Sequence, residues 1–119
     1  MRVLLVDDEE ELVSTLSERL ALRGIESDWV TSGEEGLRLA CERQYDWVVL
    51  DLKMPGIGGM ETLRNLKKQR PGTNIIVLTG HSSSEDLEQG LQHGASHYLL
   101  KPIDVEDLVQ KMQGGGPGA

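Results

Sequence analysis

The sequence lacks the features that mark secreted, disulfide-stabilised and membrane-spanning proteins. Its 119 residues contain one cysteine, Cys41, so no disulfide can form within the chain, which agrees with a reducing compartment. No apolar run approaches the length needed to cross a bilayer, and the first residues show no signal-peptide pattern. We therefore expect a cytoplasmic protein that makes no membrane contact.

Positive charge is also scarce. Twelve Lys and Arg residues stand against twenty Asp and Glu residues, which gives a formal net charge of −8. Such a surface repels phosphate backbones, so we expect no direct nucleic-acid binding by this domain. The acidic residues are unevenly placed, because Asp7 to Glu11 form an unbroken run of five carboxylates.

The remaining composition is that of an ordinary globular domain. An apolar content of 38% and a charged content of 27% are typical of soluble proteins, and a chain of this length can bury a core without disulfides or structural metal. We expect one domain over residues 1–113. Residues 114–119 are rich in glycine and are expected to form a flexible tail or a linker stub.

Five short apolar runs alternate with segments of helical periodicity. The runs are typical of strands and comprise residues 3–6, 25–30, 47–50, 75–78 and 98–100. Each is followed by apolar residues at helical spacing, namely Leu12, Val13, Leu16 and Leu20; Leu37 and Ala40; Met60, Leu63 and Leu66; Leu87 and Leu91; and Val105, Leu108, Val109 and Met112.

Local signals bound these helices. At the N-terminal ends, Ser32 with Glu35 forms a capping-box pattern, and the further N-cap candidates are Ser82 or Ser83 and Asp104. At the C-terminal ends, the stop signals are Gly24 and Gly94. Five repeats of strand and helix predict an α/β protein with a parallel sheet. Right-handed crossovers favour a three-layer, flavodoxin-like (βα)5 domain with the strand order 2-1-3-4-5.

Polar side chains stand where four of the five predicted strands end. They are Asp7 and Asp8, Asp51, Thr79 and Lys101. Because the carboxyl ends of parallel strands meet at one edge of a sheet, where ligands bind, we expect these side chains to converge. Asp7 and Asp8 could alone simply start a helix, but the arrival of Asp51 at the neighbouring strand end favours a metal site.

The converging set has the chemistry of a phosphoryl-transfer site. Three carboxylates in one crevice repel one another unless a cation lies among them, and carboxylate oxygens are ligands that Mg²⁺ prefers. Asp51 can act as the nucleophile and form an acyl phosphate. Lys101 would supply positive charge to the phosphoryl group, and Thr79 would supply a hydroxyl donor. We expect Glu9 near the same edge of the sheet, and Glu10 and Glu11 in the solvated first helical turn.

Four motifs appear in order on the matching strands: Asp7-Asp8, Asp51 followed by Met54-Pro55-Gly56, Thr79-Gly80, and Lys101-Pro102. Over roughly residues 2–113 the chain resembles the receiver domains of bacterial two-component response regulators, the CheY-like superfamily. The resemblance implies a switch that accepts a phosphoryl group on Asp51 from a sensor histidine kinase or a histidine phosphotransfer protein. The switch would then control an output domain or a partner protein. Self-directed phosphotransfer and autodephosphorylation would be its only chemistry, so it would not be an enzyme in the ordinary sense.

The resemblance also implies a role for each residue of the site. Asp8 and Asp51 would ligate Mg²⁺ directly, together with the backbone carbonyl of Lys53, while Asp7 would act through water. Lys101 would contact the phosphoryl group, and the peptide bond that follows Lys101 is expected to be cis.

Two further pairs of residues concern the signal and its duration. Thr79 and Tyr98 match the family's switch pair, in which the hydroxyl moves to the phosphoryl group and the aromatic ring turns inward. The surface of the fourth helix, fifth strand and fifth helix would then change shape, and this face is also the expected surface of a homodimer. Lys53 and His81 flank the path of the hydrolytic water in the family. We expect their bulk to slow hydrolysis and lengthen the phosphoryl lifetime.

Three other functions share parts of this pattern. A flavodoxin-type electron carrier would need a hydroxyl- and glycine-rich loop after the first strand, and here that loop is acidic. An aspartyl-phosphate phosphatase would have a second Asp where Lys53 stands, and a cap domain for which the chain is too short. A pseudo-receiver that binds partners without taking phosphate is disfavoured because all five expected side chains are present. The chain fits either a stand-alone regulator or part of a larger protein, and residues 79–95 and 98–104 look similar to receivers of enhancer-binding regulators.

Overall fold

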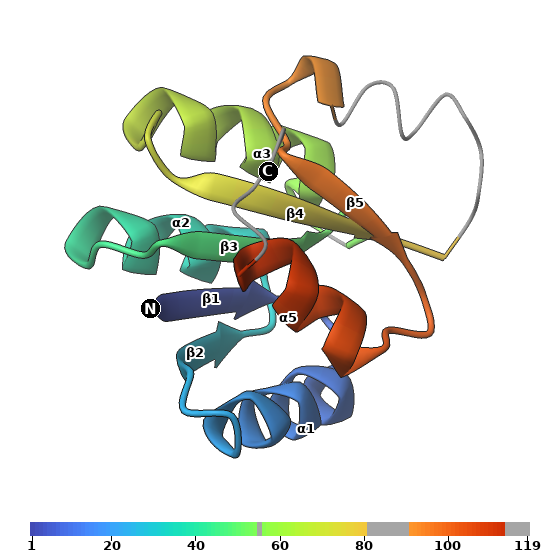
Figure 1. The fold of residues 1–119 in the computed structure, drawn as a ribbon. Coiled ribbons are helices and arrows are strands. Elements are labelled where there is room, and N and C mark those ends of the chain that lie inside the picture. The colour runs from blue at the N-terminus through green and yellow to red at the C-terminus, as the bar shows by residue number, and fades with distance from the viewer. Residues whose placement is uncertain (55, 81–90, 114–119) are drawn as a thin grey trace.

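The computed structural model describes residues 1–54, 56–80 and 91–113. Its centre is one sheet of five parallel strands in the order β2-β1-β3-β4-β5 (Figure 1). The strands are β1 (Arg2–Val6), β2 (Glu26–Val30), β3 (Trp47–Asp51), β4 (Asn74–Thr79) and β5 (His97–Leu100). The predicted fold class and the predicted strand order are confirmed.

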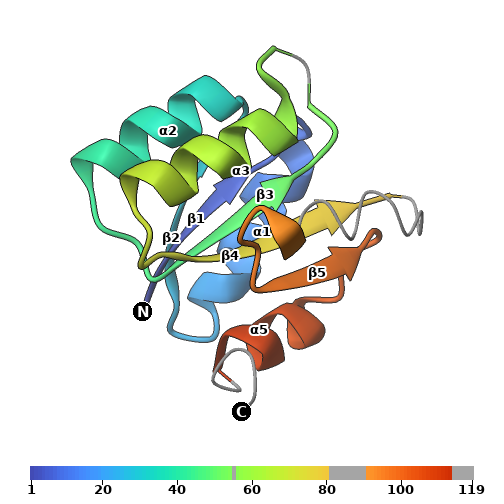
Figure 2. The same cartoon turned by 90° about the horizontal axis from the view of Figure 1, so that it is seen from above.

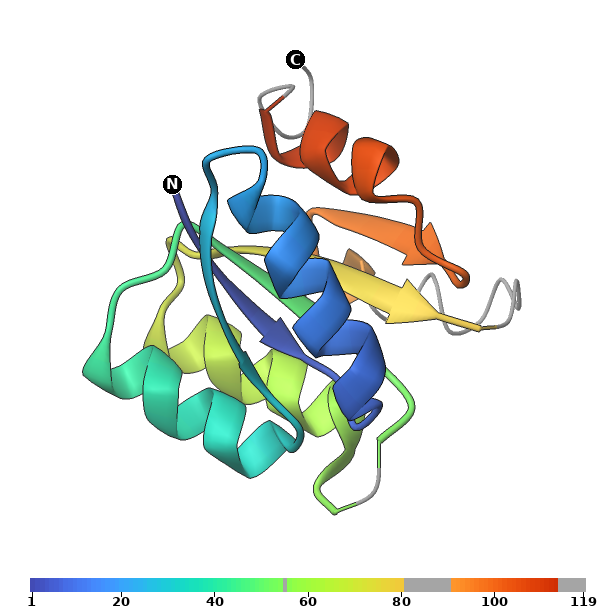
Figure 3. The ribbon, with the colours of Figure 1, turned by 90° about the horizontal axis from the view of Figure 1, so that it is seen from below.

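Helices cover both faces of the sheet and give three layers (Figures 2 and 3). In the described part of the chain they are α1 (Glu10–Ala21), α2 (Gly33–Glu42), α3 (Gly58–Gln69) and α5 (Val105–Gln113). α1 and α5 lie on one face, and α2 and α3 lie on the other. None of these described helices is both long and apolar enough to cross a membrane.

Two of the predicted segments lie outside the described residues. The first contains the N-cap candidates Ser82 and Ser83 and the apolar Leu87 of the fourth predicted helix. The second is the glycine-rich tail, residues 114–119.

The central strands are buried on both faces, because each has a neighbouring strand on either side and a helical layer above and below. Val3 to Val6 of β1 and all five residues of β3 are buried. Strands in this position read as continuous apolar runs. The edge strand β5 differs, because its residues alternate between partly buried and exposed.

The sheet separates two apolar core layers. Leu5 and Val49 belong to the layer under α1 and α5, and Leu4 and Val48 belong to the layer under α2 and α3. This division follows from the period of two along a strand, which sends successive side chains to opposite faces. Burial of each such side chain contributes about 1.5–3 kcal/mol to folding, so the ends of the central strands are held in place by packing on both sides.

The second strand is shorter than its predicted run, whereas each of the other four extends one residue beyond its run at one or both ends. Ile25 fits the second apolar run, yet β2 begins at Glu26. The Ile25 amide donates a hydrogen bond to the Leu20 carbonyl at 3.0 Å, and the Ile25 side chain is buried in the core. Gly24, with φ of 76°, makes the turn that allows this helix ending. Ile25 therefore closes α1 instead of extending the ladder.

The predicted caps are present where the structure describes them. The Ser32 side chain accepts a hydrogen bond from the Glu35 amide at 3.2 Å at the start of α2. Asp104 Oδ1 accepts one from the Glu106 amide at 2.9 Å at the start of α5. These bonds satisfy backbone donors that have no partner within the helix, and so they define where each helix begins.

Candidate functional site

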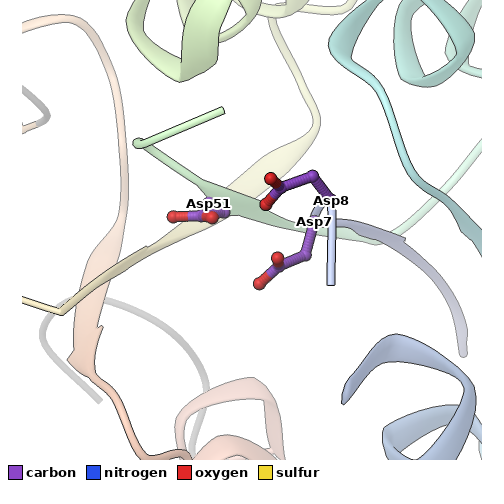
Figure 4. A group of neighbouring side chains, drawn as sticks. All are labelled: Asp7, Asp8 and Asp51. Carbon is purple, nitrogen blue, oxygen red and sulfur yellow. The ribbon is translucent and has the colours of Figure 1, made fainter. Parts of the chain in front are cut away.

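The strands of the sheet all point the same way, so their carboxyl ends share one edge, and the predicted acidic residues gather there. Asp7 and Asp8 follow β1, and Asp51 ends β3. Figure 4 shows the three carboxylates grouped at these two strand ends. One oxygen from each lies within 4.8 Å of the other two. The structure therefore brings together the three acids that the sequence pattern places at neighbouring strand ends.

The three acids differ in their surroundings. Asp7 and Asp51 are buried, whereas Asp8 is exposed. Asp7 Oδ1 accepts a hydrogen bond from the Glu9 amide at 3.0 Å, and Asp51 Oδ1 accepts one from the Lys53 amide at 3.1 Å. Each backbone bond orients one oxygen of a buried carboxylate and leaves Oδ2 for other partners.

Lys101, which follows β5, places its ammonium group among these oxygens. Its Nζ lies 2.8 Å from Asp7 Oδ2, 3.2 Å from Glu9 Oε1 and 3.4 Å from Asp51 Oδ2. The contact with Asp7 is close enough for an ion pair, but Asp7 Oδ2 has no hydrogen bond of good geometry within the described residues. The Lys101 ammonium thus faces two buried carboxylates and a third at the surface among the described residues.

Burial and neighbouring charge both act on the pKa values of the site. Burial is the largest influence on the pKa of Asp51 and raises it above the ordinary 3.8; the Lys53 amide and Lys101 lower it, and Asp7 raises it. Burial by itself lowers the pKa of Lys101, but the contacts with Asp7, Asp51 and Glu9 outweigh it and raise the pKa above 10.5. Lys101 therefore stays charged, and it does not fully offset the buried acids.

This donor set suits a hard divalent cation. Asp7, Asp8 and Asp51 offer carboxylate oxygens, the ligands that Mg²⁺ and Ca²⁺ take in proteins. The buried Asp7 Oδ2 also lacks a hydrogen-bond donor of good geometry in the described part of the chain. The described residues thus form an acidic pocket that can bind a metal ion.

The start of α3 packs closely against the backbone of Asp51 and Leu52. The Gly59 amide donates a hydrogen bond to the Leu52 carbonyl at 3.2 Å. A Cβ atom on Gly59 would lie only 2.3 Å from the Asp51 carbonyl oxygen, so only glycine allows α3 to begin here without a backbone shift. The sequence motif after Asp51 does not indicate this close approach.

The other predicted residues lie near the same edge. Thr79 ends β4 and is fully buried, and its carbonyl accepts a hydrogen bond from the Lys101 amide at 2.8 Å. Tyr98 lies on the adjacent strand β5 and is 40% exposed. The peptide bond after Lys101 is cis, as the resemblance implies. Lys53 is exposed beside Asp51, and His81 lies outside the described residues.

The contact between Glu9 and Lys101 is a further feature of the site that the sequence did not indicate. The acidic run predicts Glu9 near this edge but indicates no partner for it. Glu9 is the N-cap of α1, yet its side chain makes no capping hydrogen bond. It reaches Lys101, which is 92 residues away in the sequence. The unbroken run of acids was the only signal for a role of this residue.

The chain is similar to known proteins over nearly its whole length. The family model of the response regulator receiver domain matches residues 3–113. Among curated proteins, response regulator ArlR of Staphylococcus aureus is 35% identical over 112 residues, which cover 94% of this chain and 51% of that protein. The chain therefore spans about half the length of the curated relatives that it matches.

Solved structures give the same result. A CheY-like receiver domain protein from Methanospirillum hungatei is 31% identical with a TM-score of 0.90, covering 95% of this chain and 90% of that chain. A response regulator from Burkholderia pseudomallei, solved with a phosphorylated aspartic acid, a calcium ion and citrate, is 30% identical with a TM-score of 0.88. That likeness covers 94% of this chain and 66% of that chain. The similarity thus concerns the entire fold and not one motif.

Proposed function

Because the chain belongs to the response regulator receiver domain family of two-component signalling, we propose that it is a phosphorylation switch whose phosphoacceptor is Asp51. The observation that carries this proposal is one buried carboxylate at a strand end, beside a lysine and two further acids. Asp51 Oδ1 is held by the Lys53 amide, whereas Oδ2 lies 3.4 Å from Lys101 Nζ. The relative from Burkholderia pseudomallei contains a phosphorylated aspartic acid, which supports an aspartate as acceptor.

In the proposed reaction an oxygen of ionised Asp51 attacks the phosphorus atom of the donor. An oxygen–phosphorus bond forms while the bond from phosphorus to the donor atom breaks, and the electron pair of that bond leaves with the donor. Lys101 lies beside Asp51, and its ammonium group can form an ion pair with the phosphoryl oxygens and offset their negative charge. The chain acts on itself, through this transfer and the later hydrolysis of the acyl phosphate, and turns over no separate substrate.

We assign the metal as Mg²⁺, bound directly by Asp8, Asp51 and the carbonyl of Lys53, with Asp7 acting through water. The support is the set of carboxylate oxygens within 4.8 Å of one another, and a calcium ion in a related structure. When bound, Mg²⁺ would neutralise negative charge on the phosphoryl oxygens during transfer. Removal of divalent cations with a chelator should therefore abolish phosphorylation of folded protein.

Thr79 and Tyr98 are the proposed switch. Phosphorylation adds about one or more units of negative charge and new acceptor oxygens at Asp51. The Thr79 hydroxyl would move to donate to one of these oxygens, and the exposed Tyr98 ring would turn inward into the space that it leaves. The domain would exchange between an inactive and an active conformation. The phosphoryl group would interact more strongly with the active one, and this difference in interaction would set how far the population shifts toward it.

We propose that the signal leaves through the face formed by the fourth helix, β5 and α5. Its described part carries the exposed side chains of Tyr98 and Leu100. They border a hollow of about 570 Å³ whose charged lining residues are Asp104, Asp107 and Lys111. This face would bind an output domain or a partner protein, and it is the proposed surface of a homodimer.

A sensor histidine kinase, or a histidine phosphotransfer protein, is the proposed donor, and the cytoplasm is the proposed location of this chain. Family membership supports a kinase partner, because two-component signalling couples the two proteins. The net charge of −8 supports an output that this domain delivers by protein contact and not by binding nucleic acid itself.

We also propose that Lys53 and His81 lengthen the phosphoryl lifetime by obstructing the hydrolytic water. The support is their position in the sequence, two residues after Asp51 and two after Thr79, and the exposure of Lys53 beside the acceptor. A Lys53→Ala, His81→Ala variant should lose its phosphoryl group faster than the native protein in a mass-spectrometric time course. Slower loss from the variant would contradict this role.

The experiment that tests the proposed function is intact-mass measurement after incubation with acetyl phosphate and Mg²⁺. The native protein should gain the mass of one phosphoryl group, and the Asp51→Asn variant should gain none. Circular dichroism of both proteins checks that each is folded. A folded native protein that gains no mass in the presence of Mg²⁺ would overturn the proposal.

A further inference from the structure

Lys101 has three acidic partners, and one of them is not among the residues assigned to phosphoryl transfer. Its Nζ contacts Glu9 at 3.2 Å, in addition to Asp7 at 2.8 Å and Asp51 at 3.4 Å. The ammonium group donates hydrogen bonds to Glu9 and Asp51, while its contact with Asp7 is an ion pair without good hydrogen-bond geometry. Because the Lys101 side chain is only 18% exposed, these acids and not water are its main polar surroundings.

Helix formation does not explain the position of the Glu9 side chain. Glu9 is the N-cap of α1, but the hydrogen bond at this end is made by its backbone amide, which donates to Asp7 Oδ1. The side chain is 63% exposed, and within the described residues its ion-pair partner is Lys101. Glu9 reaches across the site to Lys101, which follows β5, and this contact limits the positions that the lysine side chain can adopt.

We propose that Glu9 is a positioning residue that restrains Lys101 in the unphosphorylated protein, so that phosphorylation requires the Glu9–Lys101 ion pair to break. This inference rests on the proposed phosphorylation of Asp51. A phosphoryl group there brings further negative charge, toward which Lys101 must turn. Glu9 then loses its cation and lies near an added charge of its own sign.

The consequence is a higher barrier to phosphorylation and a resting equilibrium shifted toward the unphosphorylated form. Small anionic donors should be affected most directly, because no protein contact helps them to displace the ion pair. Glu9 would thus suppress phosphorylation by such donors.

Two variants separate the contact from its electric charge. Glu9→Gln removes the charge of the side chain, while Glu9→Asp keeps the charge on a side chain one methylene shorter, which cannot maintain the present contact with Lys101. Glu10→Gln is the matched control. Glu10 is the next residue, exposed in the first turn of α1, and it has no ion-pair partner in the part of the chain that the structure describes.

The test measures the initial rate of phosphoryl mass gain with subsaturating acetyl phosphate and saturating Mg²⁺. Glu9→Gln and Glu9→Asp should both react about two- to fivefold faster than the native protein, the range expected for the loss of one partly exposed ion pair. Glu10→Gln should react at close to the native rate. Added salt should reduce the difference between native protein and Glu9→Gln, because it weakens the ion pair in the native protein.

The outcomes distinguish this inference from the proposed function. A native rate for Glu9→Asp, or equal rates for Glu9→Gln and Glu10→Gln, would overturn the restraint of Lys101 while the gain of mass still supports Asp51 as acceptor. A native protein that gains no mass would overturn the proposed function and this inference with it. Thermal unfolding of each variant, followed by circular dichroism, shows that the compared proteins are equally folded.

Discussion

The strands begin at one edge of the sheet, the amino edge, and end at the opposite one, the carboxyl edge. Both edges carry ion pairs between a basic side chain and carboxylates, but the pairs differ in their exposure to water. At the amino edge, Arg2 and Glu26 form a pair at 3.2 Å in which the side chains are 45% and 76% exposed. At the carboxyl edge, Lys101 is mostly buried and faces the buried acids Asp7 and Asp51. The Arg2–Glu26 pair at the amino edge is therefore solvated, whereas Asp7 and Asp51 place negative charge away from water at the carboxyl edge.

Because of this difference, we expect ion pairs at the two edges to contribute unequally to the free energy of unfolding. Exposed pairs contribute about 0–1 kcal/mol, because water already solvates both charges. Buried acids lose that solvation and depend on a cation for compensation. The amino edge adds neutral contacts, such as the stacking of Trp47 on His97 with ring centroids 6.0 Å apart. The buried acids at the carboxyl edge thus favour the binding of a further cation, whereas the charges at the amino edge are already solvated.

The largest effect is expected from Lys101→Met at the carboxyl edge. Removal of the ammonium group leaves two buried carboxylates without compensation, so the metal-free protein should lose about 3 kcal/mol of unfolding free energy. Mg²⁺ can supply the missing positive charge, so it should stabilise Lys101→Met more than it stabilises the native protein. Urea unfolding with a chelator and with Mg²⁺ measures both effects.

Arg2→Met is the matched control, because it removes one cation from the amino edge. Its loss of unfolding free energy should remain below about 1 kcal/mol and should not respond to Mg²⁺. Equal losses in the two variants would break the comparison between the edges.

A smaller effect is expected from Tyr45→Phe, just before β3. The Tyr45 hydroxyl donates a hydrogen bond to Asp28 Oδ2 at 2.7 Å, and its loss should cost about 1–2 kcal/mol of unfolding free energy. Burial, with the bond to Asp28, raises the pKa of Tyr45 from 10.0 to about 12. The contribution of the protonated phenol is thus present below pH 10 and declines between these values. Denaturation curves near pH 7 measure the loss, and unchanged stability would show that the bond to Asp28 contributes nothing.

The next effect concerns pH and His97, which begins β5. Burial, together with Lys111, lowers the pKa of His97 below its ordinary 6.5. As the pH falls through 6.5, the unfolded chain therefore binds a proton that the folded protein does not, and folding weakens. The slope from this group is at most about 1.4 kcal/mol per pH unit.

His97→Phe should keep a ring beside Trp47 but remove this titration. As the pH is lowered below 6.5, the unfolding free energy of His97→Phe should therefore fall less than that of the native protein. Urea denaturation across a pH series measures this difference. Parallel curves for the two proteins would mean that His97 is protonated equally in the folded and unfolded states.

The smallest effect is expected from Glu26→Gln. The pair with Arg2 is exposed on both sides, so the change in unfolding free energy should stay within about 0.5 kcal/mol. Glu26→Gln removes one negative charge, as the loss of an acid at the carboxyl edge would, so the two edges can be compared for the same change in charge. A loss of several kcal/mol would show that the amino edge is more tightly coupled to the core than its exposure indicates.

Most of the fold could be predicted from the sequence because its signals are local. Unbroken apolar runs such as Val3 to Val6 indicate strands buried on both faces, and residues at a spacing of three and four indicate helices. The cap at Ser32 is equally local, since donor and acceptor are three residues apart. The expected convergence of Asp51 and Lys101 needed only the rule that parallel strands end at one edge.

Sequence by itself thus determined the order of the elements, the strand order and the residue types at the carboxyl edge. Tertiary structure alone decided that Ile25 closes a helix, that Gly59 must approach the Asp51 peptide, and that Asp7 is more buried than Asp8. It also decided that Glu9 shares Lys101 with Asp7 and Asp51. The physical reason is range: periodicity and capping act over a few residues, whereas burial and ion-pair partners depend on atoms brought together by packing from distant parts of the chain.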